Sequence, residues 1–258
     1  MLLESVSDKK QIIQSVDTAL SVLLEVSREP GQTLSSLARN LGETKQKTLR
    51  MLRTMEHRKF IQRAEDGGYN LGNAILVLGT SASTQVDLVK LASPVLETLG
   101  QKMNETIQMR IRDNTEALCI AKFEPSRDLR VHAVVGRRRP LHAGSSKILL
   151  AFLSDSLIAR VLPKTLDRMT NNTITSHNDL MRELMTIRKQ GFCISHGEVS
   201  DQLVSVSVPV FAVDGSVIAA INVAAPAFRT QKSDLDRFVS LLTEAARGIS
   251  RGLGWVGK

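Results

Sequence analysis

Cysteine and aromatic residues are scarce in this sequence. Its 258 residues include two cysteines, one tryptophan, one tyrosine and seven phenylalanines. Cys119 and Cys193 stand far apart and outside any CxxC pair; a disulfide or a shared metal site stays open, but buried apolar thiols are favoured. The chain also lacks Walker, GxGxxG, GxSxG and HExxH motifs, and its five histidines form no closely spaced ligand pair. We therefore expect no catalytic residues, no metal site and no cofactor.

Long hydrophobic runs are absent as well. No stretch approaches the ~18 apolar residues that a spanning helix needs, and the start "MLLESVSDKK" lacks the basic-then-apolar layout of a signal peptide. We expect no membrane partner and a cytoplasmic location. With 42% hydrophobic residues and a mean hydropathy of −0.05, the composition is that of a globular protein. The length fits two domains or one large one.

Positive charge is present in excess and is concentrated in one segment. The chain has a net charge of +8 and a pI of about 9.8. Residues 44–63 hold seven cations and one carboxylate, which gives +6, whereas residues 1–43 hold four cations and six acids, which gives −2. Such clustering is typical of a nucleic-acid-binding element. The alternative is the solvated face of an ordinary surface helix.

Local patterns in the first third of the chain predict a winged helix-turn-helix. Apolar spacing predicts helices over residues 15–29 and 33–42 and a basic helix from Thr44 to His57. The stretch "FIQRAEDGGYNLG" then predicts a strand, a Gly-Gly turn and a second strand. In this arrangement Leu49, Leu52 and Met55 face the core. The N-terminal part of the basic helix would enter the major groove of DNA.

The predicted DNA contacts lie mostly on this basic helix. Lysine and arginine suit phosphates, and Gln46 and Arg50 can form bidentate contacts to base edges. Arg63 in the wing can reach a neighbouring phosphate. The full set of predicted DNA-binding residues is Thr33, Thr44, Lys45, Gln46, Lys47, Thr48, Arg50, Arg53 and Arg63.

The remainder of the chain predicts an α+β domain. Residues 75–104 read as a long amphipathic helix that Pro94 kinks or restarts. In "TIQMRIR", residues 106–112, Gln108 and Arg110 alternate with apolar residues. Short strands are expected over 117–123 and 130–135. Helices are expected over 145–155, 176–191 and 233–253.

The clearest local signal is a hairpin around Asp214-Gly215. A two-residue turn there makes paired residue numbers sum to 429, with Val213 facing Ser216. One face is then apolar and should pack on helices. The other face carries Ser205, Ser207 and Asn222 and suits either a ligand cavity or solvent.

The loop Gly144-Ser145-Ser146 enters an apolar helix. Backbone N–H groups at a helix start, together with serine hydroxyls and the nearby Lys147 and Arg137–Arg139, favour an anion site. An ordinary serine cap beside a solvated basic loop is the alternative.

Five segments, in this order and spacing, resemble the IclR family of bacterial transcriptional regulators. They are "QSVDTALSVLLEV", the winged unit from Leu34 to Gly72, "LASPVLETLGQKMNET", "PLHAGSSKILLAF" and the segment from Gln190 to Pro226. The resemblance implies a winged helix-turn-helix DNA-binding domain over residues 9–74, a linker helix over 75–92 and a GAF-like effector-binding domain over 93–254. It also implies a homodimer formed through the DNA-binding domains, with dimers pairing into tetramers.

The resemblance further implies where an effector binds. Family effectors are often small carboxylic or aromatic compounds, held between the start of the "PLHA" helix and the later strands. Carried over to this chain, the effector-binding residues are Gly144, Ser145, Ser146, Ser195, Ser205, Asn222 and Ala224. Ser195 and Ser205 stand where relatives often have aspartate and cysteine, so the ligand need not be a glyoxylate-like acid.

Taken together, these patterns predict a sequence-specific transcription regulator of a catabolic or related operon. Its partners would be a double-stranded DNA operator and a small organic effector, either a carboxylate or an aromatic compound, which binds in the C-terminal domain and controls DNA affinity. The alternative is a small-molecule enzyme built on the C-terminal domain, with Ser145, His142 or Cys193 reactive. No nucleophile, base and orienting group occur at a recognisable spacing, so we expect a protein that is not an enzyme.

Overall fold

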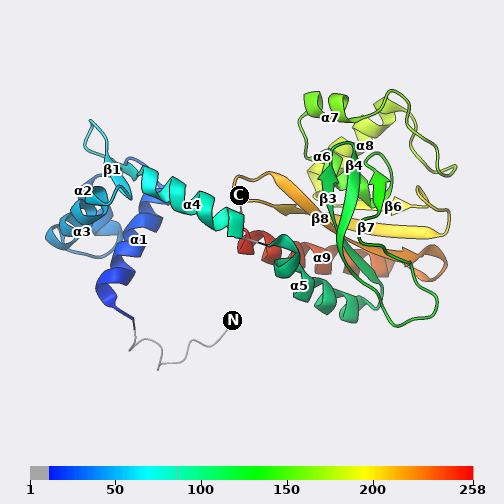
Figure 1. Cartoon of the computed structure of the whole chain (residues 1–258), viewed down its shortest axis with the longest axis horizontal. Helices are drawn as coiled ribbons and strands as arrows, with labels where there is room; N and C mark the ends of the chain where they lie inside the picture. The colour runs from blue at the N-terminus through cyan, green and yellow to red at the C-terminus, as the bar shows by residue number, and fades with distance from the viewer. Residues whose placement is uncertain (1–11, 86, 258) are drawn as a thin grey trace. The chain divides into compact units, whose positions relative to one another are not determined.

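A computed structural model describes residues 12–85 and 87–257 of the chain (Figure 1). The chain divides into two compact units, and the boundary between them along the sequence lies between residues 85 and 86. The segment "MLLESVSDKK" and residues 9–11 of the expected DNA-binding domain lie outside the described residues. Across the part that is described, no helix is long and apolar enough to cross a membrane.

The N-terminal unit has the predicted order of elements. Its helices and strands are α1 (Gln14–Arg28), α2 (Leu34–Asn40), α3 (Lys45–His57), β1 (Ile61–Arg63), β2 (Tyr69–Leu71) and α4 (Asn73–Gln85). Thr33 and Thr44 cap α2 and α3, because each side-chain oxygen accepts a backbone N–H three residues on. Gly42 adopts φ +65° between the two helices. The result is a helix-turn-helix followed by an antiparallel ribbon.

The core of this unit uses α3 slightly differently from the prediction. Leu52 and Met55 are buried, as expected. Leu49 is only half-buried, and Thr48 takes the inner position with 1% exposure. The Thr48 hydroxyl donates to the Thr44 carbonyl, which satisfies it inside the domain.

Helix α1 buries only part of its apolar surface. Val22 and Val26 are fully buried against α2 and α3. A second row, which we call the α1 stripe, stays more than half exposed: Ile13, Val16, Leu20 and Leu24. The periodicity predicted one continuous inner face. The stripe lies outside it because the small unit covers only one side of the helix.

The C-terminal unit is built on one antiparallel sheet of six strands in the order β5-β4-β3-β8-β7-β6. The strands are β3 (Thr106–Asp113), β4 (Glu116–Phe123), β5 (Arg138–Pro140), β6 (Cys193–His196), β7 (Leu203–Phe211) and β8 (Val217–Pro226). The helices are α5 (Leu88–Met103), η2 (Gly144–Ser146), α6 (Lys147–Ala151), α7 (Asp155–Val161), α8 (His177–Gln190), η3 (Ala227–Arg229) and α9 (Lys232–Gly252). Helices α5 and α9 cover one face, and the segment from η2 to α8 packs on the other (Figure 1).

The helical region after the winged unit restarts earlier than Pro94. Helix α5 begins after Asp87, whose carboxylate accepts the N–H groups of Val89 and Lys90. Pro94 lies inside α5. The range 75–92 that was expected for a linker helix therefore contains most of α4 and the first residues of α5.

The strand expected over residues 130–135 does not form. Side chains hold this segment instead of a ladder of backbone bonds. Thr106 donates to the Val131 carbonyl, Lys122 donates to the Ala133 carbonyl, and the Glu124 carboxylate accepts the Ala133 N–H. The segment is thereby fixed as a loop beside β3 and β4.

The β7–β8 hairpin has the predicted register over most of its length. Every pair from Leu203↔Pro226 to Val210↔Ala219 sums to 429. The apolar face packs on α5 and α9, as expected. The polar face is buried too: Ser207 is fully covered, and its hydroxyl donates to the Ser145 carbonyl at 2.9 Å.

The prediction of a two-residue turn in this hairpin is wrong. Ala212 rather than Val213 faces Ser216, and its N–H donates to the Ser216 carbonyl. The loop is Val213–Gly215. Gly215 has φ +79°, and the Asp214 carboxylate accepts the Ser216 N–H, a combination that favours a three-residue loop. Ile218 then stands unpaired as a bulge and restores the sum of 429.

Candidate functional site

The predicted DNA-binding residues are exposed or half-buried in the N-terminal unit, with a single exception. Lys45, Gln46, Arg50 and Arg53 are exposed on α3, and Arg63 is exposed on the wing with its guanidinium 5.8 Å from the Tyr69 ring centre. Thr33 and Thr44 are exposed at the starts of α2 and α3, where they act as caps. The exception is Thr48, whose side chain is buried.

Lys47 already has a partner in this unit. Its ammonium group pairs with the Glu43 carboxylate one turn earlier. A phosphate would compete with Glu43 for this lysine. Among the predicted cations on α3, Lys45, Arg50 and Arg53 form no ion pair with any residue in the described part of the chain, so they are ready for an anionic partner.

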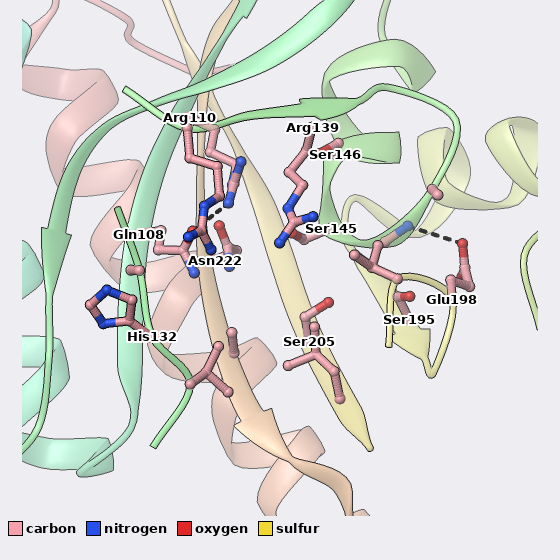
Figure 2. A pocket seen from close by; sticks show the side chains of 18 of the residues that line it. Gln108, Arg110, His132, Arg139, Ser145, Ser146, Ser195, Glu198, Ser205 and Asn222 are labelled. Atoms are coloured by element: carbon pink, nitrogen blue, oxygen red, sulfur yellow. Dashed lines mark hydrogen bonds between the residues drawn. The ribbon is translucent and has the colours of Figure 1, made fainter. Parts of the chain in front are cut away.

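A cavity in the C-terminal unit gathers all seven predicted effector-binding residues (Figure 2). It lies on the polar face of the sheet, between the β7–β8 hairpin, β3 and the turn η2, and has a free volume of about 60 Å³. The predicted residues that line it are Gly144, Ser145, Ser146, Ser195, Ser205, Asn222 and Ala224. The strand pairs Ser195↔Ser205 and Ser205↔Ala224 bring three of them side by side.

One end of the cavity is rich in arginine. Arg110 on β3 and Arg139 on β5 reach toward the cavity, and Arg137 lines it as well (Figure 2). Burial lowers the pKa of Arg110, and the charges of Arg139 and Arg137 lower it further, although the neighbouring Cys119 acts in the opposite direction. Burial and Arg137 likewise lower the pKa of Arg139. The three cations therefore repel one another in an enclosed space.

The other end of the cavity is fixed by a buried ion cluster. The Glu198 carboxylate accepts the Gly144 N–H at 3.1 Å (Figure 2). It also pairs with the Lys147 ammonium at 2.6 Å. Lys147, which is 1% exposed, also pairs with Glu183 of α8 at 2.9 Å. Burial acts to lower the pKa of Lys147, but the negative charges around it more than offset this and leave the pKa raised. Because the Cys193 thiol is uncharged near neutral pH, those charges come from the two carboxylates.

Sequence reasoning missed or undervalued several residues of the cavity. Gln108 and Arg110 had been placed on the polar face of β3, but nothing local indicated that this face is enclosed. Glu198 was not singled out, because "SHGEVS" has no periodic pattern. His132 also lines the cavity, and its Nδ1 lies 3.0 Å from a carboxylate oxygen of Glu124. Among the described residues, no cluster of three His, Cys, Asp or Glu side chains could hold a metal ion.

Two of the three residues considered for an enzymatic role, His142 and Cys193, are held in structural ones. His142 is 2% exposed, and its Nε2 lies 3.0 Å from the Asp167 carbonyl oxygen. Cys193 is fully buried, and burial raises the pKa of its thiol to about 12. Both cysteines are free.

The state of Cys193 can be tested directly. A thiol with a pKa of about 12 is almost entirely protonated at pH 8, and the protonated form is a poor nucleophile. We expect iodoacetamide to leave Cys193 unmodified in the native protein at pH 8 and to modify both cysteines in urea, as read by mass spectrometry. Rapid alkylation of Cys193 in the native protein would instead support the alternative that the C-terminal domain is a small-molecule enzyme.

Comparison with known proteins agrees with this geometry in both units. Residues 15–65 match the family model for the IclR helix-turn-helix domain, and residues 80–251 match the model for the bacterial transcriptional regulator IclR C-terminal domain. The chain is 32% identical over 248 residues to the HTH-type transcriptional repressor AllR of Klebsiella pneumoniae, covering 93% of this chain and 90% of that one.

Solved structures show the same fold. An IclR transcriptional regulator from Silicibacter sp. TM1040 superposes with a TM-score of 0.84 at 23% identity, covering 95% of this chain and 97% of that one. An IclR homologue from Microbacterium hydrocarbonoxydans, crystallised with 4-hydroxybenzoate, is 25% identical with a TM-score of 0.60, covering 92% and 98%. The chain therefore belongs to the IclR family of bacterial transcriptional regulators, with a helix-turn-helix DNA-binding domain and a C-terminal ligand-binding domain.

Proposed function

We propose that this regulator binds a double-stranded operator through α3 and the wing, and that a small organic effector in the cavity controls its DNA affinity. The observation that carries the effector site is the meeting of seven residues from separate segments of the chain around one cavity. The proposed division is residues 9–74 for DNA binding, 75–92 for the linker and 93–254 for the effector. The regulated genes are those of a catabolic or related operon.

The DNA-binding half of the proposal rests on exposure and charge. On α3, Lys45 and Arg53 serve phosphates, and Gln46 and Arg50 serve base edges. Lys47 also contacts a DNA phosphate once that phosphate replaces Glu43 as its partner. Arg63 reaches the DNA backbone from the wing. Thr33 and Thr44, which cap α2 and α3, are exposed at the helix ends that face the DNA in this proposal. Since phosphate contacts release counterions, affinity should fall steeply with salt.

The effector half rests on the cavity and on a relative. The Microbacterium homologue was crystallised with 4-hydroxybenzoate, a small organic acid. The cavity of this chain has serine, asparagine and glutamine side chains in its lining and cations at one end. An effector changes DNA affinity only if it binds the competent and incompetent states with different affinity.

We also propose that the working species is a homodimer, which can pair into a dimer of dimers. The α1 stripe supports it: Ile13 is 67% exposed and Leu24 is 61% exposed, and the four side chains recur on one face of the helix. A contiguous apolar row on a small basic domain is a typical contact for a second copy of the same surface. Two copies then present two copies of α3 to two half-sites.

The test of the whole proposal is a gel shift of the full chain on the intergenic DNA beside its own gene, with excess random competitor. A discrete complex that survives the competitor, and that a panel of small organic acids releases or tightens, is the expected result. A complex that random DNA removes would show that the basic surface binds DNA without sequence preference and would overturn the regulator mechanism proposed for this surface.

Arg50 provides a sharper test of base recognition. Replacing Arg50 with alanine is expected to weaken operator binding by about 1–3 kcal/mol and to relax the preference at one base pair, because a bidentate base contact is lost. Binding to random DNA should change much less. The matched control is Arg160→Ala, which removes the same charge from the exposed side of α7. An equal loss on operator and random DNA would reassign Arg50 to the phosphate backbone.

A further inference from the structure

We propose that the effector is a small hydroxy acid that binds with its anionic group at the arginine end of the cavity and its hydroxyl groups at the serine end. The inference rests on the proposed function of the cavity as the effector site. It differs from the expectation that an acid sits on the N–H groups at the start of the η2–α6 helix. Three observations on the described residues carry it.

The first observation is a buried arginine without a counterion. Arg110 is 8% exposed, and its Nε and Nη1 atoms are buried with no hydrogen-bond partner among the described residues. Only Nη2 is used, by donating to the Gln108 side-chain oxygen. A buried guanidinium presents its donors in a planar fork that matches a carboxylate. Leaving such donors unpaired is costly, so the site is built for an anion that completes it.

The neighbours of Arg110 also support the interpretation of this end of the cavity as an anion site. In the described part of the chain neither Arg110 nor Arg139 forms an ion pair, although both point toward the cavity (Figure 2). Asn222, which pairs with Gln108 across the strands, has its side-chain oxygen buried without a partner. A ligand with an anionic oxygen and an adjacent hydroxyl would meet the free donors of Arg110 and the free acceptor of Asn222 together.

The second observation is that one N–H group at the helix start, that of Gly144, is already occupied. The Gly144 N–H donates to Glu198, a carboxylate of the protein itself. Glu198 is 7% exposed and is tied to Lys147, so it is not readily displaced. A ligand carboxylate at this end would lie beside a buried negative charge, whereas at the arginine end it would neutralise a positive one. Charge alone therefore orients an acid toward Arg110.

The third observation is the hydroxyl lining of the end near Glu198. Ser195 and Ser205 are buried and face each other across β6 and β7, and their hydroxyls form no hydrogen bond with any of the residues described. Ser145 and Ser146 complete this wall. Serine hydroxyls and a carboxylate suit the hydroxyl groups of a ligand, which both donate and accept.

The size of the cavity limits the ligand. A water-sized group needs about 10–15 Å³ of such space, so the free volume of about 60 Å³ holds roughly four to six of them. This is the size of a short-chain hydroxy acid. Glycolate, acetate and ethylene glycol form a matched set of probes, because they carry both groups, only the carboxylate, and only hydroxyls.

The test is calorimetric unfolding of the full chain with each probe at equal ionic strength. Glycolate should raise the Tm in a saturable way, acetate should do so less and ethylene glycol should not. Arg110→Gln should weaken glycolate binding at least about tenfold, because a charge-assisted hydrogen bond is lost, and Arg110→Lys should weaken it partially. Arg112→Gln, on the same strand outside the cavity, is the control and should bind glycolate normally.

Two results would overturn the inference. One is the absence of any glycolate effect on the wild-type Tm. The other is normal glycolate binding by Arg110→Gln together with tighter binding by Glu198→Gln, since that pattern would place the acid at Gly144. Gel shifts separate this failure from failure of the proposed function: Arg110→Gln should still bind the operator, and calorimetry reports on the cavity whether or not DNA is bound.

Discussion

Replacing Lys147 with methionine is expected to destabilise the C-terminal unit by about 3–5 kcal/mol. The lysine is 1% exposed and pairs with Glu198 and Glu183. Methionine keeps most of the volume but leaves the Glu198 carboxylate buried without its cation, and a stranded buried charge is what makes breaking such a pair costly. Glu183 is one-third exposed and can turn toward water, so most of the loss comes from Glu198.

Urea unfolding of the variant and of Lys147→Met/Glu198→Gln measures this effect. The double variant should recover part of the loss, because glutamine can still accept the Gly144 N–H but carries no charge. Lys164→Met, at an exposed lysine, should change stability little. If the double variant were less stable than Lys147→Met, the stranded charge would not be the cause.

The same cluster has a defined pH dependence. The folded-state pKa of Lys147 is raised above its ordinary value of 10.5. The stability that it contributes is therefore fully present below that ordinary value and is lost as the pH rises through the raised folded-state value. From pH 6 to 9, the protonation of Lys147 should therefore not make the difference in unfolding free energy between wild type and Lys147→Met vary with pH.

Placing glutamates at Leu20 and Leu24 is expected to lower operator affinity by about 10²–10⁴-fold. Both side chains belong to the α1 stripe and are more than half exposed in the single chain, so the substitutions should leave the fold intact. Four carboxylates brought together across the proposed interface would repel one another. Each chain would then bind one half-site, without the gain that comes from linking two sites.

Analytical ultracentrifugation and gel shifts on full and half operators test this prediction. The variant should be smaller in solution and weaker on the full operator, yet close to normal on a half-site at high concentration. Phe228→Glu supplies the control, since Phe228 is 70% exposed in the other unit. Unchanged assembly in the Leu20→Glu/Leu24→Glu variant would remove the α1 stripe from the dimer contact.

Local chemistry made the winged unit predictable. Thr33, Thr44 and Gly42 lie close in sequence to the helix ends that they define, so short windows contain the information. The hairpin register was predictable for the same reason, because Asp214-Gly215 placed the turn to within one residue. Thr48 and Leu49 show the limit: two neighbours on α3 differ in burial by a small rotation of the helix that spacing alone does not resolve.

Two charged residues of the cavity, Arg110 and Glu198, could not be placed there from the sequence in this way. Alternation placed Arg110 on the polar face of β3, but the cavity there depends on pairing with β8, as in Gln108↔Asn222. Glu198 acts on Lys147, 51 residues away in sequence. The α1 stripe was visible as apolar spacing, but which of two adjoining apolar rows the domain covers is decided by α2 and α3.

The two irregularities of the β7–β8 hairpin cancel each other. The loop Val213–Gly215 takes one residue more than a two-residue turn, and Ile218 gives that residue back before the strands reach the cavity. In evolutionary terms, this loop can lose one residue and become a two-residue turn while Ala212 still faces Ser216. Loss of Ile218 would likewise remove only the bulge and leave Val210 opposite Ala219. Single deletions at these two places are therefore neutral for the strand pairing of Ser205 and Asn222.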